Sequence, residues 1–250
     1  MPLSGVRDIS PLLGHAPTMP GLKTEPFAIH RAEILHLIFE SESSSMLELL
    51  PKALHPTIPP TVTFNVMHCP EGPAGPFTLA QVRVGCRAGV RPRGFPLACF
   101  CDSDEAAAAL KDRWGYNCLP GAVRLRHLHD RVVGTVEAGG HTALHVELVD
   151  PHPISGNDVQ YTANMNLARV PYGVELKPRL VQVDPEYTFH RAERGRPSVV
   201  AFDQTPWHAA GLNAVYGISA TYAVADVLLP RIRYLCDPDI TALQGTETVN

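Results

Sequence analysis

The fold is decided by the stretch Lys111-Asp112-Arg113-Trp114-Gly115-Tyr116-Asn117-Cys118-Leu119-Pro120-Gly121. It begins inside a predicted helix over residues 103–113, in which Asp102 is the expected N-cap and Glu105 follows three residues later. Four alanines add helix propensity to that segment. Beyond the helix, aromatic, amide and thiol side chains follow one another closely. The stretch therefore joins a helix to a segment whose side chains are able to line a pocket.

On both sides of this stretch the sequence predicts short strands. Alternating or apolar segments bounded by turn residues predict strands over residues 32–39, 61–67, 77–87, 95–101, 142–149, 160–170 and 179–183, with a hairpin of 123–128 and 132–136 around His129. Strands in this number usually close into a barrel or a sandwich, which removes their exposed edges. We therefore expect an α+β fold dominated by antiparallel sheet.

Two more helices are expected outside the central stretch. A short helix starts within residues 43–48, with Ser45 as N-cap, Glu48 three residues later and Pro51 limiting its length. A final helix is expected over residues 214–228, ending before Pro230.

Length and composition are typical of one globular domain. The chain has 250 residues, 45% of them hydrophobic and 18% charged, which suffices for a sizeable core and a pocket. Twenty-four prolines and nineteen glycines favour strands and turns over long helices. We expect a single domain over residues 1–250, in which residues 1–25 form an arm of the kind that often packs on a neighbouring subunit.

Charge and cysteine usage exclude several classes of protein. A net charge of −4 and a pI near 6.3 provide no basic field for nucleic acid. The six cysteines have neither zinc-ribbon spacing nor the density of a disulfide framework, so free thiols in the cytoplasm are expected. Residues 1–21 contain four prolines and no continuous apolar core, which predicts neither a signal peptide nor a membrane span.

Several stretches together resemble the acetoacetate decarboxylase-like superfamily. Residues 111–121 resemble its signature, roughly Arg-Glu-(two or three residues)-Tyr-Pro-Lys-Lys-Leu-Gly. Residues 224–231, Val-Ala-Asp-Val-Leu-Leu-Pro-Arg, match its closing Leu-Ala-Asp-Ile-Ile-Leu-Pro-Arg almost residue for residue. Weaker likenesses fall at 63–67, 75–79, 133–136 and 164–171. The resemblance covers residues 25–237 in the family's order.

This resemblance implies a fold, an assembly and a reaction. The fold is a cone-shaped, mostly antiparallel β-barrel with a few flanking helices, whose interior forms the active site, and the assembly is a homo-oligomer. The family's decarboxylases form an imine between a lysine and the substrate ketone, and a second lysine lowers the pKa of the first. A glutamate and an arginine orient the substrate carboxylate and handle the proton.

The charged groups of that reaction are mostly replaced in this sequence. Aligned on Tyr116 and Gly121, the imine-forming lysine falls on Cys118, its neighbour on Leu119 and the preceding proline on Asn117. The family's Tyr-x-Glu motif falls on Phe77 and Leu79, and its arginine falls close to Arg31 or His30. A thiol forms no stable iminium with a ketone, so Schiff-base decarboxylation is not expected.

Two candidates could replace the lost lysine chemistry. Cys118 would act as nucleophile or general acid if positive charge lowered its pKa, and the alternative is that it only fills the volume of the missing lysine. Arg83 shares a strand face with Gln81 and Leu79, so it could hold a carboxylate or an enolate in the barrel. The alternative for Arg83 is a solvated side chain outside the barrel.

Other residues are expected to line the pocket or are candidates beside it. Tyr116 could donate a hydrogen bond to a substrate carbonyl or act as an acid, and Trp114 lies beside it. Asn65 and Cys99 come from neighbouring strands, and Glu71 is the one acid in the loop before Phe77.

A metal site is the weaker alternative. His127 and His129 form a His-x-His pair that could bind a metal with His141 or His145, but no carboxylate spacing completes the site. We therefore expect neither a metal nor a cofactor.

The sequence as a whole favours a cofactor-independent lyase, dehydratase or cyclase of secondary metabolism. Its partner would be a carbonyl-bearing small molecule, relatively large and apolar because the pocket has lost charge and keeps aromatic walls. Catalysis would proceed by orientation and by hydrogen bonding to an enolate. Two alternatives stay open: a pseudoenzyme that only binds a small molecule, and a β-keto acid decarboxylase that works without an imine.

Overall fold

A computed structural model describes residues 3–249 of the chain. Three short helical segments accompany the sheet: α1 (Ser43–Leu49), α2 (Asp104–Trp114) and α3 (Ala242–Gly245). The strands are β1 (Phe27–Glu40), β2 (His55–Pro56), β3 (Thr61–Cys69), β4 (Phe77–Ala88), β5 (Arg91–Cys101), β6 (Cys118–Pro120), β7 (Ala122–His127), β8 (Arg131–Ala138), β9 (His141–Ile154), β10 (Ala163–Tyr172), β11 (Glu175–Val183), β12 (Glu186–Phe202), β13 (Tyr216–Leu229), β14 (Tyr234–Cys236) and β15 (Thr246–Thr248). None of the described helices is long and apolar enough to cross a membrane.

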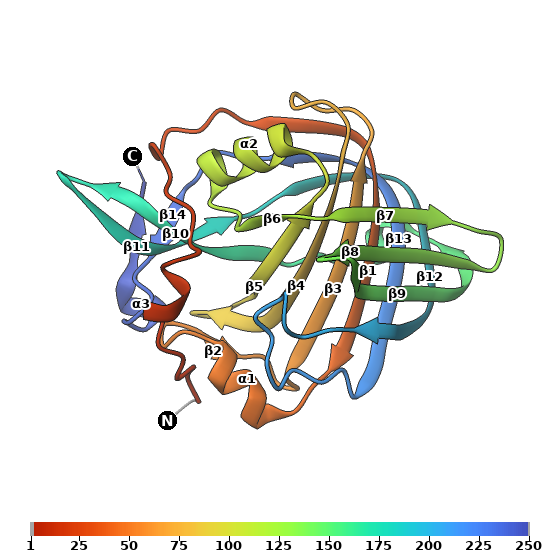
Figure 1. The fold of residues 1–250 in the computed structure, drawn as a ribbon, viewed down its shortest axis with the longest axis horizontal. Helices are drawn as coiled ribbons and strands as arrows, with labels where there is room; N and C mark the ends of the chain where they lie inside the picture. The colour runs from red at the N-terminus through yellow and green to blue at the C-terminus, as the bar shows by residue number, and fades with distance from the viewer. Residues whose placement is uncertain (1–2, 250) are drawn as a thin grey trace.

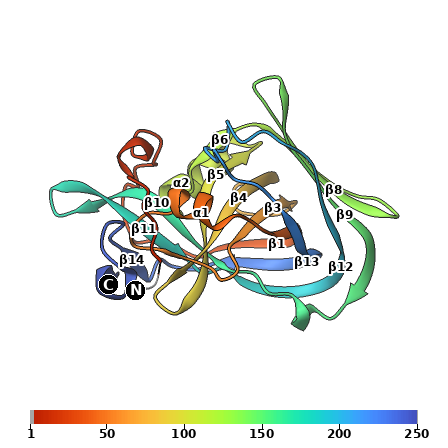
Figure 2. The same ribbon diagram turned by 90° about the horizontal axis from the view of Figure 1, so that it is seen from below.

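All the strands belong to one strongly curved sheet (Figures 1 and 2). Its order is β15-β14-β11-β10-β5-β4-β3-β1-β13-β12-β9-β8-β7, with β2 beside β4 and β6 beside β5. Pairing is antiparallel except for β10 with β5 and β6 with β5. The mostly antiparallel fold with few helices confirms the predicted fold class, although β7 and β15 do not pair with each other in the described part of the chain.

The two faces of β1 belong to two different cores. Leu35 and Leu37 point into the larger core, which β7, β8 and β9 cover from the other side. Ile34 points into the second core, which lies under α2. Because side chains alternate along a strand, β1 contributes side chains to both cores. His36 lies on the same face as Ile34, the face of the second core. Figure 1 shows α2 lying across this part of the sheet.

Residues 214–228 form a strand, so the predicted final helix is wrong. β13 lies between β1 and β12, with Leu35 opposite Tyr222 and Tyr222 opposite Glu193. Alternate residues Ala225, Val227 and Leu229 are buried, a period of two that the alanine content hid. Its partner β12 was not predicted at all, because residues 186–202 are rich in charge.

Both predicted N-caps are displaced. Helix α1 begins at Ser43 after Glu42, so Ser45 lies inside it. Helix α2 is capped by Ser103, whose hydroxyl accepts a hydrogen bond from Ala106 N at 3.3 Å. Asp102 instead accepts one from Thr78 N at 2.6 Å, which ties the helix start to β4.

The N-terminal arm packs on its own chain. Gly5 N donates to Leu54 O at 2.8 Å, and further along Met19 N donates to Arg169 O at 2.9 Å. The expected contact of this arm with a neighbouring subunit stays a prediction.

Gly115 is the residue that ends α2 and directs the chain into the site. It has φ +67°, and a Cβ there would lie 2.7 Å from Ala168 Cβ on β10. We expect Gly115→Ala to lower the free energy of unfolding by about 2–4 kcal/mol, since left-handed strain and overpacking add together. Urea unfolding measures the loss. Gly89→Ala is the matched control, because Gly89 has φ +66° and open space around it, and should lose about 1–2 kcal/mol. Equal losses of unfolding free energy in the two variants would show that the contact with Ala168 does not add to the destabilisation.

Candidate active site

A small enclosed cavity lies on the Ile34 side of the sheet, beneath the segment that follows α2. Its volume is about 30 Å³, room for one or two water molecules. The lining residues are Ile34, Asn65, Met67, Leu79, Gln81, Arg83, Tyr116, Tyr161, Thr162, Asn164, Pro185, Tyr187, Val227 and Leu229. They come from β1, β3, β4, β10, β12 and β13 and from the loops beside them. Polar side chains therefore meet at one point from strands far apart in the sequence.

Strand β4 supplies the polar floor of the cavity. Leu79, Gln81 and Arg83 alternate with Ala80 and Val82, which point into the larger core. Asn65 on β3 lies directly opposite Gln81 in the ladder and lines the same cavity. The structure thus places Arg83 inside the molecule, with 5% of its surface exposed.

Arg83 is held by neutral acceptors. Its Nη1 donates to Asn164 Oδ1 at 2.9 Å and to Thr162 O at 3.1 Å. Its Nη2 lies 3.0 Å from His36 Nε2. Since a guanidinium only donates, His36 Nε2 must be the acceptor in that contact. The Nε of Arg83 and the Nε2 of Gln81 are buried without a hydrogen-bond partner among residues 3–249.

The cavity carries a positive charge that no carboxylate balances. Within residues 3–249, no Asp, Glu or Lys lines it and no acid forms an ion pair with Arg83. Burial lowers the pKa of Arg83 from its ordinary value, yet a guanidinium stays charged at neutral pH. Burial, with the Arg83 cation beside it, holds the pKa of His36 well below 6.5, so His36 is neutral. An unpaired buried cation is costly, which favours binding of an anion.

Three tyrosines surround the charge. Burial raises the pKa of Tyr187 to about 12, and it also raises the pKa values of Tyr116 and Tyr161. All three hydroxyls are therefore protonated at neutral pH. The Tyr116 oxygen accepts a hydrogen bond from Asn164 Nδ2 at 3.4 Å, which leaves its own O–H free to donate. The tyrosines add hydrogen-bond donors to a cavity that already holds a cation.

Cys118 and Cys99 lie outside the cavity lining. They are partners in the parallel β5–β6 ladder, and their Sγ atoms are 3.2 Å apart. Each is 2% exposed or less, in the core under α2. Trp114 is in that core too, where its Nε1 donates to Pro230 O at 2.8 Å, and Phe77 belongs to the same core. These four predicted pocket residues stand beside the cavity without lining it.

Other predicted residues lie elsewhere. Asn117 points to the opposite side of the chain from Tyr116 and lines a separate small cavity with His15 and His208. Leu119 packs against the larger core, because side chains alternate along β6.

Arg31 does not reach the cavity. It is exposed at a bulge in β1 with φ +52°, and its backbone N donates to Asp226 Oδ1. The neighbouring His30 is also exposed, and Glu71 is an exposed loop residue whose carbonyl oxygen accepts from His30 N. The position at which the resemblance placed the family's arginine therefore lies on the surface, and Arg83 is the arginine of the cavity.

The two histidines of the predicted metal site, His127 and His129, have different surroundings. His127 Nε2 lies 2.8 Å from Glu193 Oε2, and His129 is exposed at the β7–β8 turn. Across the described range 3–249, no three His, Cys, Asp or Glu side chains gather as a group able to hold a metal ion.

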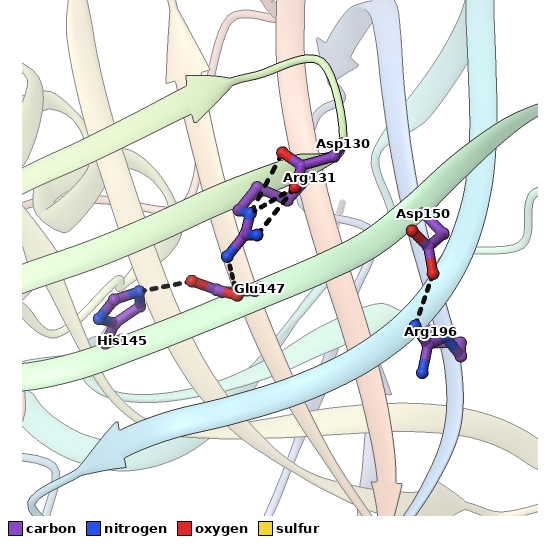
Figure 3. Close-up of polar contacts among 6 residues, drawn as sticks. All are labelled: Asp130, Arg131, His145, Glu147, Asp150 and Arg196. Carbon is purple, nitrogen blue, oxygen red and sulfur yellow. Dashed lines mark hydrogen bonds and ion pairs between the residues drawn. The ribbon is translucent and has the colours of Figure 1, made fainter.

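His145, the other candidate ligand, belongs to a charged network on β8 and β9 (Figure 3). Its Nε2 lies 3.1 Å from Glu147 Oε1, and Arg131 joins the other oxygen of Glu147 to Asp130. Figure 3 also shows Asp150 paired with Arg196 on the neighbouring strand β12. These are ion pairs of the protein surface, distant from the cavity lining.

Sequence reasoning missed His36, Tyr161, Asn164 and Tyr187. His36 lies in a correctly predicted strand as a polar residue in an apolar run, a signal that was present. Asn164 lies in a stretch that carried the resemblance. Tyr161 lies at the start of the predicted strand over residues 160–170, and Tyr187 lies in a segment rich in charge, so only the folded chain brings both to Arg83.

Comparison with known proteins gives a family and several similar folds. The family model described as Acetoacetate decarboxylase (ADC) matches residues 15–238. The crystal structure of acetoacetate decarboxylase from Legionella pneumophila subsp. pneumophila str. Philadelphia 1 is similar, with 19% identity, coverage of 87% of this chain and 90% of that chain, and a TM-score of 0.73. No match was found among curated protein sequences.

Two other solved structures are similar in fold. The enduracididine biosynthesis enzyme MppR, complexed with the condensation product of pyruvate and imidazole 4-carboxaldehyde, has 15% identity, 87% and 96% coverage and a TM-score of 0.67. An acetoacetate decarboxylase-like enzyme from Sphingomonas wittichii RW1 has 15% identity, 83% and 91% coverage and a TM-score of 0.65. At these identities the likeness concerns the fold. Since the family model covers most of its length, the chain belongs to the acetoacetate decarboxylase family.

Proposed function

We propose that this chain is a cofactor-independent enzyme of the lyase type, acting on a small carbonyl compound that carries a carboxylate or develops an enolate. The observation that carries the proposal is Arg83, a buried cation without a carboxylate partner in a polar cavity. The sequence favoured a larger and more apolar substrate. A cavity lined by tyrosines, amides and an arginine supports a polar and anionic one instead.

Each lining group has a proposed role. Arg83 and the free Nε2 of Gln81 would bind the anionic oxygens, and the Tyr116 hydroxyl would donate to the carbonyl oxygen. Leu79, Ile34 and Met67 would exclude water and strengthen these contacts. In a β-keto acid, the bond between the α-carbon and the carboxylate would break, CO2 would leave, and the electron pair would move onto the carbonyl oxygen to form an enolate facing these donors, which then takes a proton from solvent. Cys118 would support Tyr116 from behind, the volume-filling role.

The chemistry would proceed without an imine. All four lysines, Lys23, Lys52, Lys111 and Lys177, lie within the described range, and none lines the cavity. We expect borohydride treatment in the presence of acetoacetate or pyruvate to give no reduced lysine adduct by peptide mass spectrometry. A lysine-dependent acetoacetate decarboxylase treated in parallel is the positive control. An adduct on any of the four lysines would contradict the proposal.

A non-catalytic binding protein is the second candidate. It is favoured by the absence of any Asp, Glu, Lys or Cys from the lining described above, which leaves few groups for proton transfer at neutral pH. Incubation with β-keto acids and ketones followed by NMR separates the two. Loss of substrate signals supports the enzyme, whereas saturable binding of an unchanged compound supports the binding protein.

The similar fold of MppR, an enduracididine biosynthesis enzyme, supports a role for this chain in secondary metabolism.

A further inference from the structure

The pair of thiols beneath the cavity is the feature that the proposed function leaves unused. Cys99 and Cys118 face each other across the β5–β6 ladder with Sγ atoms 3.2 Å apart. Two of the other four thiols bond to backbone carbonyls: Cys101 Sγ donates to Ser103 O and Cys236 Sγ donates to Asp237 O, both at 3.4 Å. All six cysteines are free and buried. Only the first pair thus combines direct strand register with thiol contact among the described residues.

We propose that Cys99 and Cys118 are a site of reversible disulfide formation. Backbone pairing brings the two residues together: they are partners in the parallel ladder, and Cys99 N donates to Asn117 O at 3.2 Å across the two strands. Paired residues on neighbouring strands have the Cα separation that a disulfide requires. The bond would therefore form with little movement of the backbone.

Hydrogen peroxide is the oxidant that fits the surroundings. One thiol takes an oxygen from peroxide, giving a sulfenic acid and one water, and the second thiol displaces hydroxide from that sulfur, giving the disulfide and a second water. Both thiols are buried, which disfavours a bulky disulfide as the oxidant and favours a reagent close to water in size. Burial raises the pKa of Cys99, so the reaction is slow at neutral pH and accelerates as the pH rises.

The disulfide would close a loop that contains α2 and Tyr116. Its two ends are residues 99 and 118, and Tyr116 lies two residues before one of them. Cross-linking a loop of this length is expected to raise the melting temperature by about 5–10 °C for a chain of this size. It would also fix the backbone next to the hydroxyl that lines the cavity.

The test is peptide mapping after peroxide treatment of the full chain. We expect a mass loss of about 2 Da, reversed by dithiothreitol, and a cross-linked peptide that contains Cys99 and Cys118. Cleavage after Phe100 separates Cys99 from Cys101 and makes the assignment unambiguous. Oxidised glutathione applied to the folded protein is expected to give no such peptide.

Two variants control the experiment. Cys99→Ala should abolish the cross-link and the rise in melting temperature, whereas Cys86→Ala, which removes a buried thiol elsewhere, should keep both. A circular dichroism spectrum checks that each variant is folded. The proposal is overturned if wild-type protein keeps both thiols after peroxide treatment, if these thiols go on to sulfinic acid, or if the bond joins Cys101 or Cys69 instead.

Discussion

Arg83→Gln is expected to lower kcat/KM on an identified substrate by about 100- to 1000-fold while leaving the free energy of unfolding unchanged or higher. The loss of activity follows because the substrate anion loses its one cationic partner in the cavity. Stability is retained because the substitution removes a buried charge that no carboxylate balances. The glutamine amide still donates two hydrogen bonds, so two of the three acceptors around residue 83 can keep a partner.

Both halves of this result are measurable. Urea unfolding without ligand gives the stability, and titration with acetoacetate or pyruvate followed by NMR gives binding before a substrate is known. Arg179→Gln is the matched control, since Arg179 is equally buried but pairs with Asp237 at 3.3 Å and Glu247 at 3.4 Å. That variant should lose stability and keep activity. Should Arg83→Gln lose several kcal/mol instead, Arg83 would be a structural residue.

The parts of the site that the sequence predicted are those that one strand determines. Leu79, Gln81 and Arg83 share a face because side chains alternate, so their common position follows from local geometry alone. Alignment to the family's signature likewise brought Tyr116 to the lining. The same alignment placed Cys118 there as well, although its thiol turns to Cys99 beside the cavity.

The rest depended on how distant segments meet. His36 contacts Arg83 because β1 pairs with β3 and β3 with β4 in a fixed register, and Tyr161 and Tyr187 come from the loop before β10 and from the start of β12. The polar His36 stands out in an apolar run, but no local pattern shows that these side chains meet at Arg83. The strand β13 was misread for a related reason: its alanines favour a helix in isolation, whereas pairing with β1 and β12 on both sides overrides that propensity. Pairing between distant strands therefore determines both the strand conformation of β13 and the position of the site residues that the sequence did not predict.

His36 should make the protein less stable in mild acid. Its pKa in the folded chain lies well below 6.5, because burial and Arg83 disfavour the imidazolium. The unfolded chain binds a proton near pH 6.5, so the stability that neutral His36 contributes is complete above that pH and is lost as the pH falls below it. Between pH 7 and pH 5 we expect the free energy of unfolding to fall because of this residue, by at most about 2 kcal/mol, the limit that proton binding to the unfolded imidazole sets.

Urea unfolding at a series of pH values measures this effect, and His36→Gln isolates it. The glutamine oxygen can still accept from Arg83 Nη2, but it does not titrate. The variant should therefore show a shallower decline, with a remainder from His208, whose pKa is also lowered by burial and by the charges of His15 and Arg7. Identical declines in the two proteins would mean that His36 is protonated in the folded state. Arg83 would then face a second cation, and the neutral acceptor that holds its guanidinium toward the substrate anion would be lost.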